Sequence, residues 1–181
     1  QGVAAAINCR DRLGAAACGH CSSCGKFRSG NHPDFLVVRP TKGMIKIEQI
    51  RQLAKELSYP PFESKTRIVV LEDVHTMRRE AANSLLKTLE EPPADNLLVL
   101  TAEVSQEILA TLTSRCQVVP FTQLSTGDTA AILMTHGVET DAALLLARLS
   151  EGSPGRAMLF RKSEMISLWR ETVGVLSDPA I

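Results

Sequence analysis

Short apolar runs alternate with segments of helical periodicity over residues 34–121, and this alternation restricts the fold more than any other feature. Four runs are predicted strands, at residues 34–38, 66–71, 96–101 and 117–121. Their apolar residues are continuous, which is typical of strands covered on both faces of a sheet. Because helical segments separate them, the strands are expected to be parallel and joined by crossovers. The sequence therefore predicts an α/β domain.

The helices expected between these strands are residues 45–57, 78–91 and 106–112. In the second helix, Ala81, Leu85 and Leu89 share one face, and the pair Pro92-Pro93 ends it. After Thr122 the pattern becomes helical throughout, with helices expected at 127–136, 140–149 and 155 to about 176. We therefore expect an α/β domain over residues 1–121 and a small helical domain over residues 122–181.

Composition narrows the function classes only slightly. The chain has 20 basic and 20 acidic residues, so no overall positive field indicates nucleic-acid binding, although a local patch or partner subunits could still contact DNA. No apolar run reaches the roughly 18 residues of a membrane span, and no signal peptide is visible, so a cytoplasmic location is expected. The chain begins at Gln1 inside a helix-like stretch, which suggests a fragment of a longer protein.

Four of the five cysteines fall early in the chain, at Cys9, Cys18, Cys21 and Cys24. Two-residue gaps let neighbouring thiolates face one tetrahedral centre, so the pattern predicts a structural zinc module over residues 9–24. A disulfide is the alternative, disfavoured in a cytoplasmic chain. His20 is expected to be a bystander or a group next to the ligands. Cys116 is expected to pack as a small apolar residue.

Acidic residues follow the second predicted strand. Glu72 and Asp73 stand where a nucleotide-binding α/β protein holds magnesium, and a solvated acidic pair at a strand end is an equally weighted alternative. The next two residues are Val74 and His75, where an active ATPase usually has a further carboxylate. No G-x-x-x-x-G-K-[ST] loop occurs in the sequence. The acidic motif is therefore degenerate.

Arg115 ends the short segment Leu112-Thr-Ser-Arg-Cys116, after a predicted helix and before a predicted strand. A guanidinium in this position can stabilise charge on the γ-phosphoryl group of a nucleotide held by another subunit. The alternative is that the arginine only complements the dipole of the preceding helix.

Together these motifs resemble the AAA+ clamp-loader subunits of bacterial DNA polymerase III, most closely the delta prime subunit, with gamma/tau next. The resemblance covers nearly the whole chain. Its most specific part is the block Ala82-Asn-Ser-Leu-Leu-Lys-Thr-Leu-Glu-Glu-Pro-Pro93 followed by Thr113-Ser-Arg-Cys116. It also rests on the cysteine cluster and on Asn31-His-Pro-Asp34, Ile47-Glu-Gln-Ile-Arg51 and Gly152-Ser-Pro-Gly-Arg-Ala157.

The resemblance implies a RecA-like AAA+ parallel sheet with a zinc-binding loop, followed by a three-helix lid domain. The family's P-loop strand and collar domain lie outside this sequence. By position, Arg115 is similar to the arginine finger that reaches a neighbouring gamma or tau site, and Thr101 to the residue that senses the γ-phosphate. Gly155 replaces the lid arginine of hydrolysing members. Arg156 comes one residue later, which on a helix turns it about 100° away.

These features imply a delta prime-like subunit that does not itself hydrolyse ATP and has no polymerase activity. Its expected cofactors are structural zinc and, only at the neighbour's site, ATP with magnesium. Its expected partners are gamma/tau, delta, the sliding clamp and primer-template DNA. Two alternatives remain: an ATP-hydrolysing gamma/tau subunit whose P-loop lies upstream, and a zinc-containing DNA-recognition module. Neutral net charge and the lack of aromatic residues interleaved with basic residues weaken the second alternative.

Overall fold

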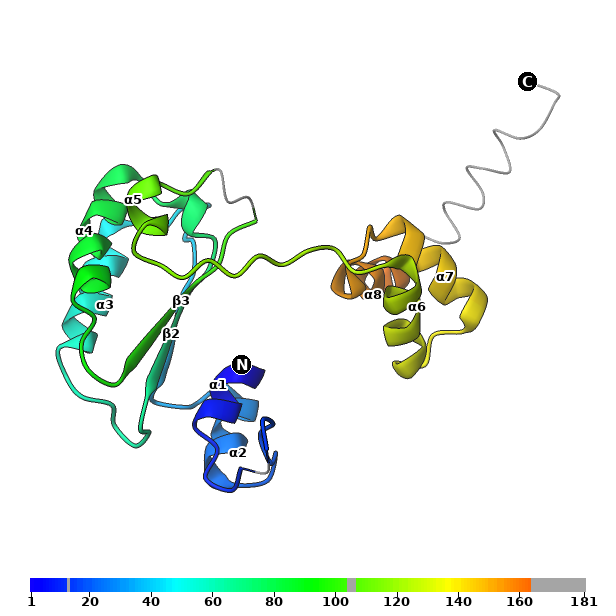
Figure 1. Cartoon of the computed structure of the whole chain (residues 1–181), viewed down its shortest axis with the longest axis horizontal. Helices are drawn as coiled ribbons and strands as arrows, with labels where there is room; N and C mark the ends of the chain where they lie inside the picture. Colours follow the sequence, from blue (N-terminus) through cyan, green and yellow to red (C-terminus); the bar gives the residue numbers. More distant parts are fainter. Residues whose placement is uncertain (13, 104–106, 164–181) are drawn as a thin grey trace. The chain divides into compact units, whose positions relative to one another are not determined.

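The computed structural model describes residues 1–12, 14–103 and 107–163 (Figure 1). The chain divides into two compact units, Gln1–Val118 and Val119–Ile181. Each unit has its own hydrophobic core. The two units are therefore described separately below.

The first unit is built on a parallel sheet whose described strands follow the order β1-β2-β3. In its register, Phe35 of β1 lies opposite Ile68 of β2, which lies opposite Leu97 of β3. An α-helix lies between β1 and β2 and another between β2 and β3, so the predicted parallel arrangement with helical crossovers is confirmed. The bounds are β1 Phe35–Val38, α3 Ile47–Leu57, β2 Arg67–Leu71, α4 Arg79–Glu90 and β3 Asn96–Leu100.

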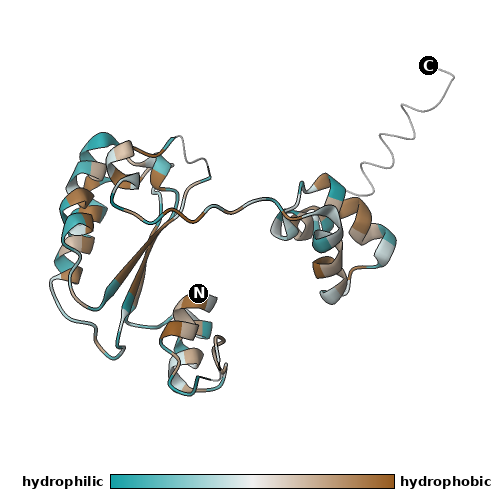
Figure 2. Cartoon of the chain, viewed as in Figure 1, coloured by the Kyte–Doolittle hydropathy of each residue, from teal (hydrophilic) through white to brown (hydrophobic). Residues whose placement is uncertain are grey.

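Helices cover both faces of this sheet. Val69 and Leu71 of β2 point into a core formed with α3 and α4. Ile68 and Val70, which alternate with them, pack on the opposite side against Ala4 of α1 (Gly2–Ile7) and Phe27 of α2 (Ser22–Ser29). Figure 2 shows β2 and β3 as brown, apolar ribbons. Burial on both faces explains why the strands have continuous apolar sequences.

Two short helices complete the first unit. The 3-10 turn η1 (Val74–Thr76) follows β2, and α5 (Ala110–Thr113) precedes Arg115. The helix expected at residues 106–112 thus begins later, at Ala110; Gln106 lies outside the described residues. Leu112 of α5 is buried in the core shared by α3 and α4.

The prediction of a strand at residues 117–121 is wrong. These residues have no strand geometry, and Val118, Val119 and Phe121 are 62 %, 65 % and 95 % exposed. A strand is stabilised by hydrogen bonds to a neighbouring strand. Within the described part of the chain, β3 pairs only with β2, and no backbone hydrogen bond joins residues 117–121 to the sheet. The β-forming composition of the segment is therefore insufficient to make it a strand.

The second unit contains three packed helices, α6 (Thr126–Thr135), α7 (Thr140–Leu149) and α8 (Pro154–Lys162). Their shared core includes Leu133 and Leu146. The remainder of the helix expected to reach about residue 176 lies outside the described residues.

Gly152, which lies between α7 and α8, contacts the segment that precedes α6. It has φ +76°, and a Cβ atom there would lie 2.4 Å from the Leu124 carbonyl oxygen. The Leu124 N–H donates to the Gly152 carbonyl at 3.2 Å. Only glycine satisfies both the left-handed backbone and this close approach.

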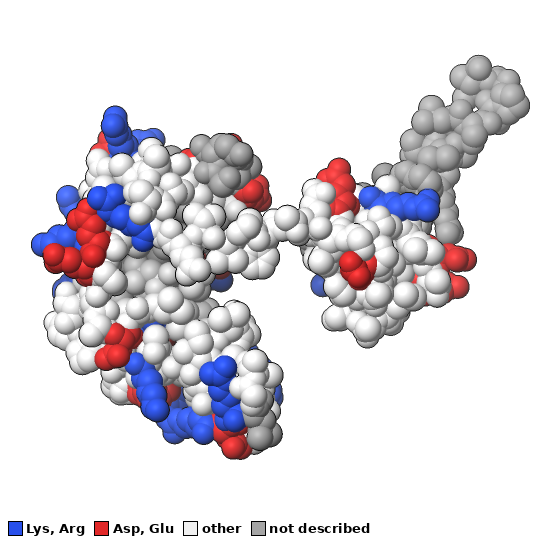
Figure 3. Space-filling model, in the orientation of Figure 1, with Lys and Arg blue, Asp and Glu red and all other residues white. Residues whose placement is uncertain are grey.

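On the face shown in Figure 3, acidic and basic side chains of the first unit are interspersed. This distribution agrees with the equal numbers of acidic and basic residues in the sequence. Within the described residues, no helix combines the length and apolar character needed to cross a membrane.

Candidate functional site: a cysteine cluster and an arginine at the end of α5

The four early cysteines converge at one point of the first unit. Cys9 follows α1, Cys18 lies in the connecting loop, and Cys21 and Cys24 lie at the N-terminal end of α2. Their Sγ atoms all lie within 4.8 Å of one another. The predicted spacing thus brings the four thiols together, and the cluster could hold a metal ion.

The distances within the cluster suit metal ligands better than disulfides. Cys24 Sγ lies 3.7 Å from Cys9 Sγ and 3.9 Å from Cys18 Sγ, and all four cysteines are free. A disulfide needs an S–S distance of about 2.05 Å. Backbone N–H groups also point at the sulfurs: Cys18 N–H donates to Cys9 Sγ and Cys21 N–H to Cys18 Sγ, each at 3.3 Å.

These contacts shift the acidity of the thiols in opposite directions. The backbone N–H groups of Cys24 and Arg10 lower the pKa of Cys21 to about 6, and the Cys18 backbone lowers the pKa of Cys9. At Cys24 the Gly19 backbone also lowers the pKa, but burial and the three nearby sulfurs outweigh it and raise the pKa to about 12. Four negative charges cannot be held this close together without a cation. A bound cation would remove this restriction on Cys24.

His20 lies beside the cluster and contacts Asp11. Its Nε2 is 3.0 Å from Asp11 Oδ2, and its Nδ1 is 3.0 Å from the Cys18 carbonyl oxygen. Asp11, Cys18 and His20 also bring their ligand atoms within 4.8 Å of one another, but this group shares Cys18 with the four-cysteine cluster. The hydrogen bond that His20 donates to the Asp11 carboxylate raises the pKa of His20.

A buried ion pair that the sequence did not reveal supports the neighbouring loop. Asp34, completely buried before β1, accepts the backbone N–H groups of Phe62, Glu63 and Ser64 at 2.6–2.8 Å. Arg67 lies 3.7 Å away and donates to the carbonyl oxygens of residues 56, 59 and 60. The only sequence signal is a charged residue at the start of each of two apolar runs.

The nucleotide-site candidates lie at the carboxyl ends of β2 and β3, as predicted for parallel strands. Asp73 N–H donates to Thr101 Oγ1 at 3.3 Å, and Asp73 itself has a left-handed backbone with φ 54°. Glu72 is held by Arg39 through two hydrogen bonds of 2.9 and 3.2 Å. The structure thus brings Thr101 to Asp73 but engages the Glu72 carboxylate elsewhere.

Arg115 follows α5 and lies at the surface, with its side chain 33 % exposed. Its Nε and Nη2 both donate to Glu90 Oε1, at 2.8 and 2.5 Å. Glu90, the last residue of α4, is a partner that sequence spacing could not identify, since 25 positions separate the two residues.

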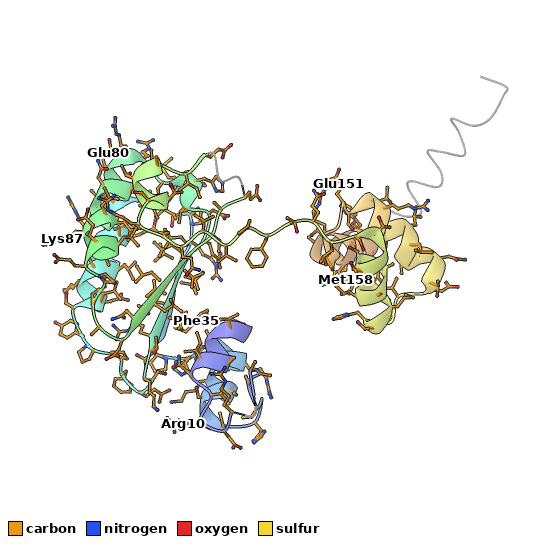
Figure 4. The ribbon with its side chains drawn as sticks, viewed as in Figure 1. Arg10, Phe35, Glu80, Lys87, Glu151 and Met158 are labelled. Atoms are coloured by element: carbon orange, nitrogen blue, oxygen red, sulfur yellow. The ribbon has the colours of Figure 1, made fainter. Side chains whose placement is uncertain are left out.

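Arg156 is engaged within the second unit. Its Nη1 donates to Glu151 Oε2 at 3.1 Å, and its guanidinium carbon lies 5.7 Å from the centre of the Phe160 ring. Figure 4 labels Glu151 on this unit. Gly155 occupies the first turn of α8 and has open space around it.

Comparison with known proteins identifies the family. A model of the family described as "DNA polymerase III, delta subunit" matches residues 1–125. The chain is 38 % identical over 151 residues to DNA polymerase III subunit delta' of Bacillus subtilis and 34 % identical over 157 residues to that of Escherichia coli, covering 83 % of this chain in each case. It spans about half the length of these relatives, 46 % of each.

Solved structures support the fold class. A DNA polymerase III gamma subunit-related protein of Thermotoga maritima matches with a TM-score of 0.50 and 28 % identity, covering 65 % of this chain and 43 % of that one. The RuvB Holliday junction branch migration motor of the same organism matches with a TM-score of 0.54 and 17 % identity, covering 75 % and 47 %. The likeness to RuvB, at 17 % identity, supports the fold and says nothing about function. The parallel α/β AAA+ class expected from the sequence is confirmed, and the chain belongs to the DNA polymerase III delta subunit family.

Proposed function

We propose that this chain is part of a delta prime-like clamp-loader subunit, which helps to load the sliding clamp onto primed DNA during replication. In this proposal the subunit does not hydrolyse ATP. It supplies Arg115 to the ATP site of a neighbouring gamma or tau subunit. The identity of 34–38 % to proteins named subunit delta' supports this assignment over gamma/tau.

The observation that carries the proposal is the position of Arg115. It lies at the surface directly after helix α5, where a second subunit can reach it. Pairing does not separate the candidates, since Arg115 is paired with Glu90 as Glu72 is with Arg39 and Arg156 with Glu151. What favours a role in a neighbour's site is that Arg115 stands in the segment Thr113-Ser-Arg-Cys116, which resembles the family's arginine finger.

We further propose that the cysteine cluster binds one structural zinc ion. Zinc bound to four thiolates at about 2.3 Å in a tetrahedron requires sulfurs about 3.8 Å apart. The Sγ distances of 3.7 and 3.9 Å agree with this value. Four sulfur ligands complete the tetrahedron, so the ion would hold α1, the loop and α2 together without an open position for a substrate.

The proposal is tested with Arg115→Ala in the assembled loader, using the full-length subunit. We expect DNA-stimulated ATP turnover to fall by about tenfold or more at the site that Arg115 serves, because the transition-state charge loses a cation. Arg51→Ala, at an exposed position on α3, is the matched control and should turn over ATP normally. Unchanged turnover with Arg115→Ala, in a complex that still assembles, would refute the role.

A second candidate is an ATP-hydrolysing subunit of the gamma/tau type. This candidate is supported by an identity of 32 % over 114 residues to DNA polymerase III subunit tau of Salmonella typhimurium. Equilibrium titration of the isolated full-length subunit with ATP distinguishes the two. Absence of binding agrees with the first candidate, whereas micromolar binding with hydrolysis favours the second.

A further inference from the structure

The guanidinium of Arg115 is almost fully engaged by its own chain. Nε and Nη2 donate to Glu90 Oε1, at 2.8 and 2.5 Å. Nη1 donates to the Thr111 carbonyl at 3.0 Å and to Ser114 Oγ at 3.2 Å. Since a guanidinium has five N–H donors, these four contacts leave one N–H uncommitted.

One free N–H can offer a phosphate only a single hydrogen bond. Arginine recognises phosphate most strongly through two parallel hydrogen bonds from one edge of the guanidinium. In the observed arrangement every edge includes at least one N–H already bound within the chain. In addition, the Glu90 carboxylate would face a triphosphate with like charge. Arg115 must therefore leave part of its present set of partners before it can serve a nucleotide.

We propose that Glu90 is a latch that holds Arg115 in a resting position until a neighbouring subunit presents a nucleotide phosphate. This inference rests on the proposed function of Arg115. Glu90 is then a positioning residue, because it acts only through the arginine. The neighbour's phosphate releases the latch by offering more negative charge than one carboxylate.

The strength of the pair suits a reversible latch. The Arg115 and Glu90 side chains are 33 % and 49 % exposed, so solvent weakens their attraction. A half-exposed pair of this kind shifts an equilibrium by up to about fivefold, which corresponds to ~1 kcal/mol. Such a shift keeps Arg115 mostly at rest but lets a triphosphate compete with Glu90 for it.

The position of Glu90 makes a clean variant possible. Glu90 is the last residue of α4, where a negative charge is unfavourable beside the helix dipole. Removing that charge should therefore leave the helix intact. Glu90→Gln keeps the size of the side chain, and Glu91→Gln makes the same charge change at the exposed neighbouring position.

The experiment measures ATP turnover of the complete loader with and without primed DNA, using full-length subunits. With Glu90→Gln we expect turnover without DNA to rise by about fivefold while turnover with DNA stays nearly constant, so the stimulation ratio falls. Glu91→Gln should leave both rates unchanged. Glu90→Asp, which keeps the charge on a shorter side chain, should restore part of the ratio.

A double variant shows whether Glu90 acts through Arg115. In an Arg115→Ala background, adding Glu90→Gln should change nothing. If Arg115→Ala lowers turnover but Glu90→Gln leaves the ratio unchanged, or lowers both rates, the latch is wrong while the arginine role stands. A Glu90→Gln effect that persists without Arg115 would also overturn the latch. If Arg115→Ala itself has no effect, both proposals fail.

Discussion

At the residue scale, Asp34 shows how one buried charge organises a loop. A carboxylate with no solvent exposure is tolerated only when its charge is compensated. Burial raises the pKa of Asp34, but the N–H groups of Glu63, Phe62 and Ser64 and the nearby Arg67 outweigh burial and lower the pKa below its usual value. The side chain thereby joins the start of β1 to the loop that leads into β2.

We expect Asp34→Asn to reduce the free energy of unfolding by about 3 kcal/mol at pH 7, because Arg67 loses its buried partner. Since the pKa of Asp34 is lowered by folding, its stabilising effect is present above the unfolded pKa of about 3.9 and is lost as the pH falls below it. Urea unfolding at pH 7 and at pH 3 checks both statements. The difference between wild type and variant should shrink at pH 3.

The control for this measurement is Asp95→Asn. Asp95 is exposed and has a positive φ of 59°, which asparagine also adopts readily. This substitution should leave stability almost unchanged at either pH. Equal stability of Asp34→Asn and Asp95→Asn at pH 7 would show that the buried pair contributes little.

At the element scale, the sequence correctly predicted the strands and helices whose own pattern of apolar residues indicates which positions are buried. The apolar runs of β1, β2 and β3 and the periodic face of α4 belong to this group. The run at 117–121 has the same composition, but a strand also depends on a neighbour, which composition does not report. Helix α2 was missed because Gly25 and several polar residues obscure its periodicity, and its N-terminal cap is Cys21 itself.

The same reasoning applies to the candidate site. The cysteine cluster was predictable because its members are close in sequence, so spacing alone restricts their geometry. The pairs Arg67–Asp34 and Arg115–Glu90 link residues that are 33 and 25 positions apart. Such pairs depend on how elements pack against one another, and sequence patterns carry little information about that packing.

Gly152 provides a test at this scale. We expect Gly152→Ala to destabilise the second unit by about 2 kcal/mol, because the new Cβ meets the Leu124 backbone and the left-handed φ becomes strained. Amide hydrogen exchange of α6, α7 and α8 in the full chain measures the loss. Gly155→Ala is the matched control: it lies in α8 with open space and should raise protection slightly. Equal protection in both variants would contradict the proposed constraint.

At the scale of the whole molecule, the cysteine cluster belongs to one unit only. It links the end of α1 to α2, and these helices pack on the face of β2 opposite α3 and α4. None of the four cysteines of the cluster belongs to the hydrophobic core of the second unit. Loss of a bound ion should therefore have a local effect.

We expect elemental analysis to find one zinc ion per chain and Cys21→Ser to abolish it. In the variant, or after chelation, amide protection should fall in α1 and α2 and persist in α6 and α7. Cys116→Ser is the control, since Cys116 lies outside the cluster. A metal-free chain with intersulfur bonds and unchanged protection of α1 and α2 would refute the metal assignment.

The segment at residues 117–121 has a consequence for handling the protein. Val118, Val119 and Phe121 are exposed, uncharged and β-forming, a combination that favours self-association through intermolecular strands. Pro120 interrupts the run and has no N–H to donate to a neighbouring chain, so it acts as a gatekeeper against aggregation. A substitution of Pro120 in an engineered variant would therefore remove this barrier and favour fibril-like assembly of the segment.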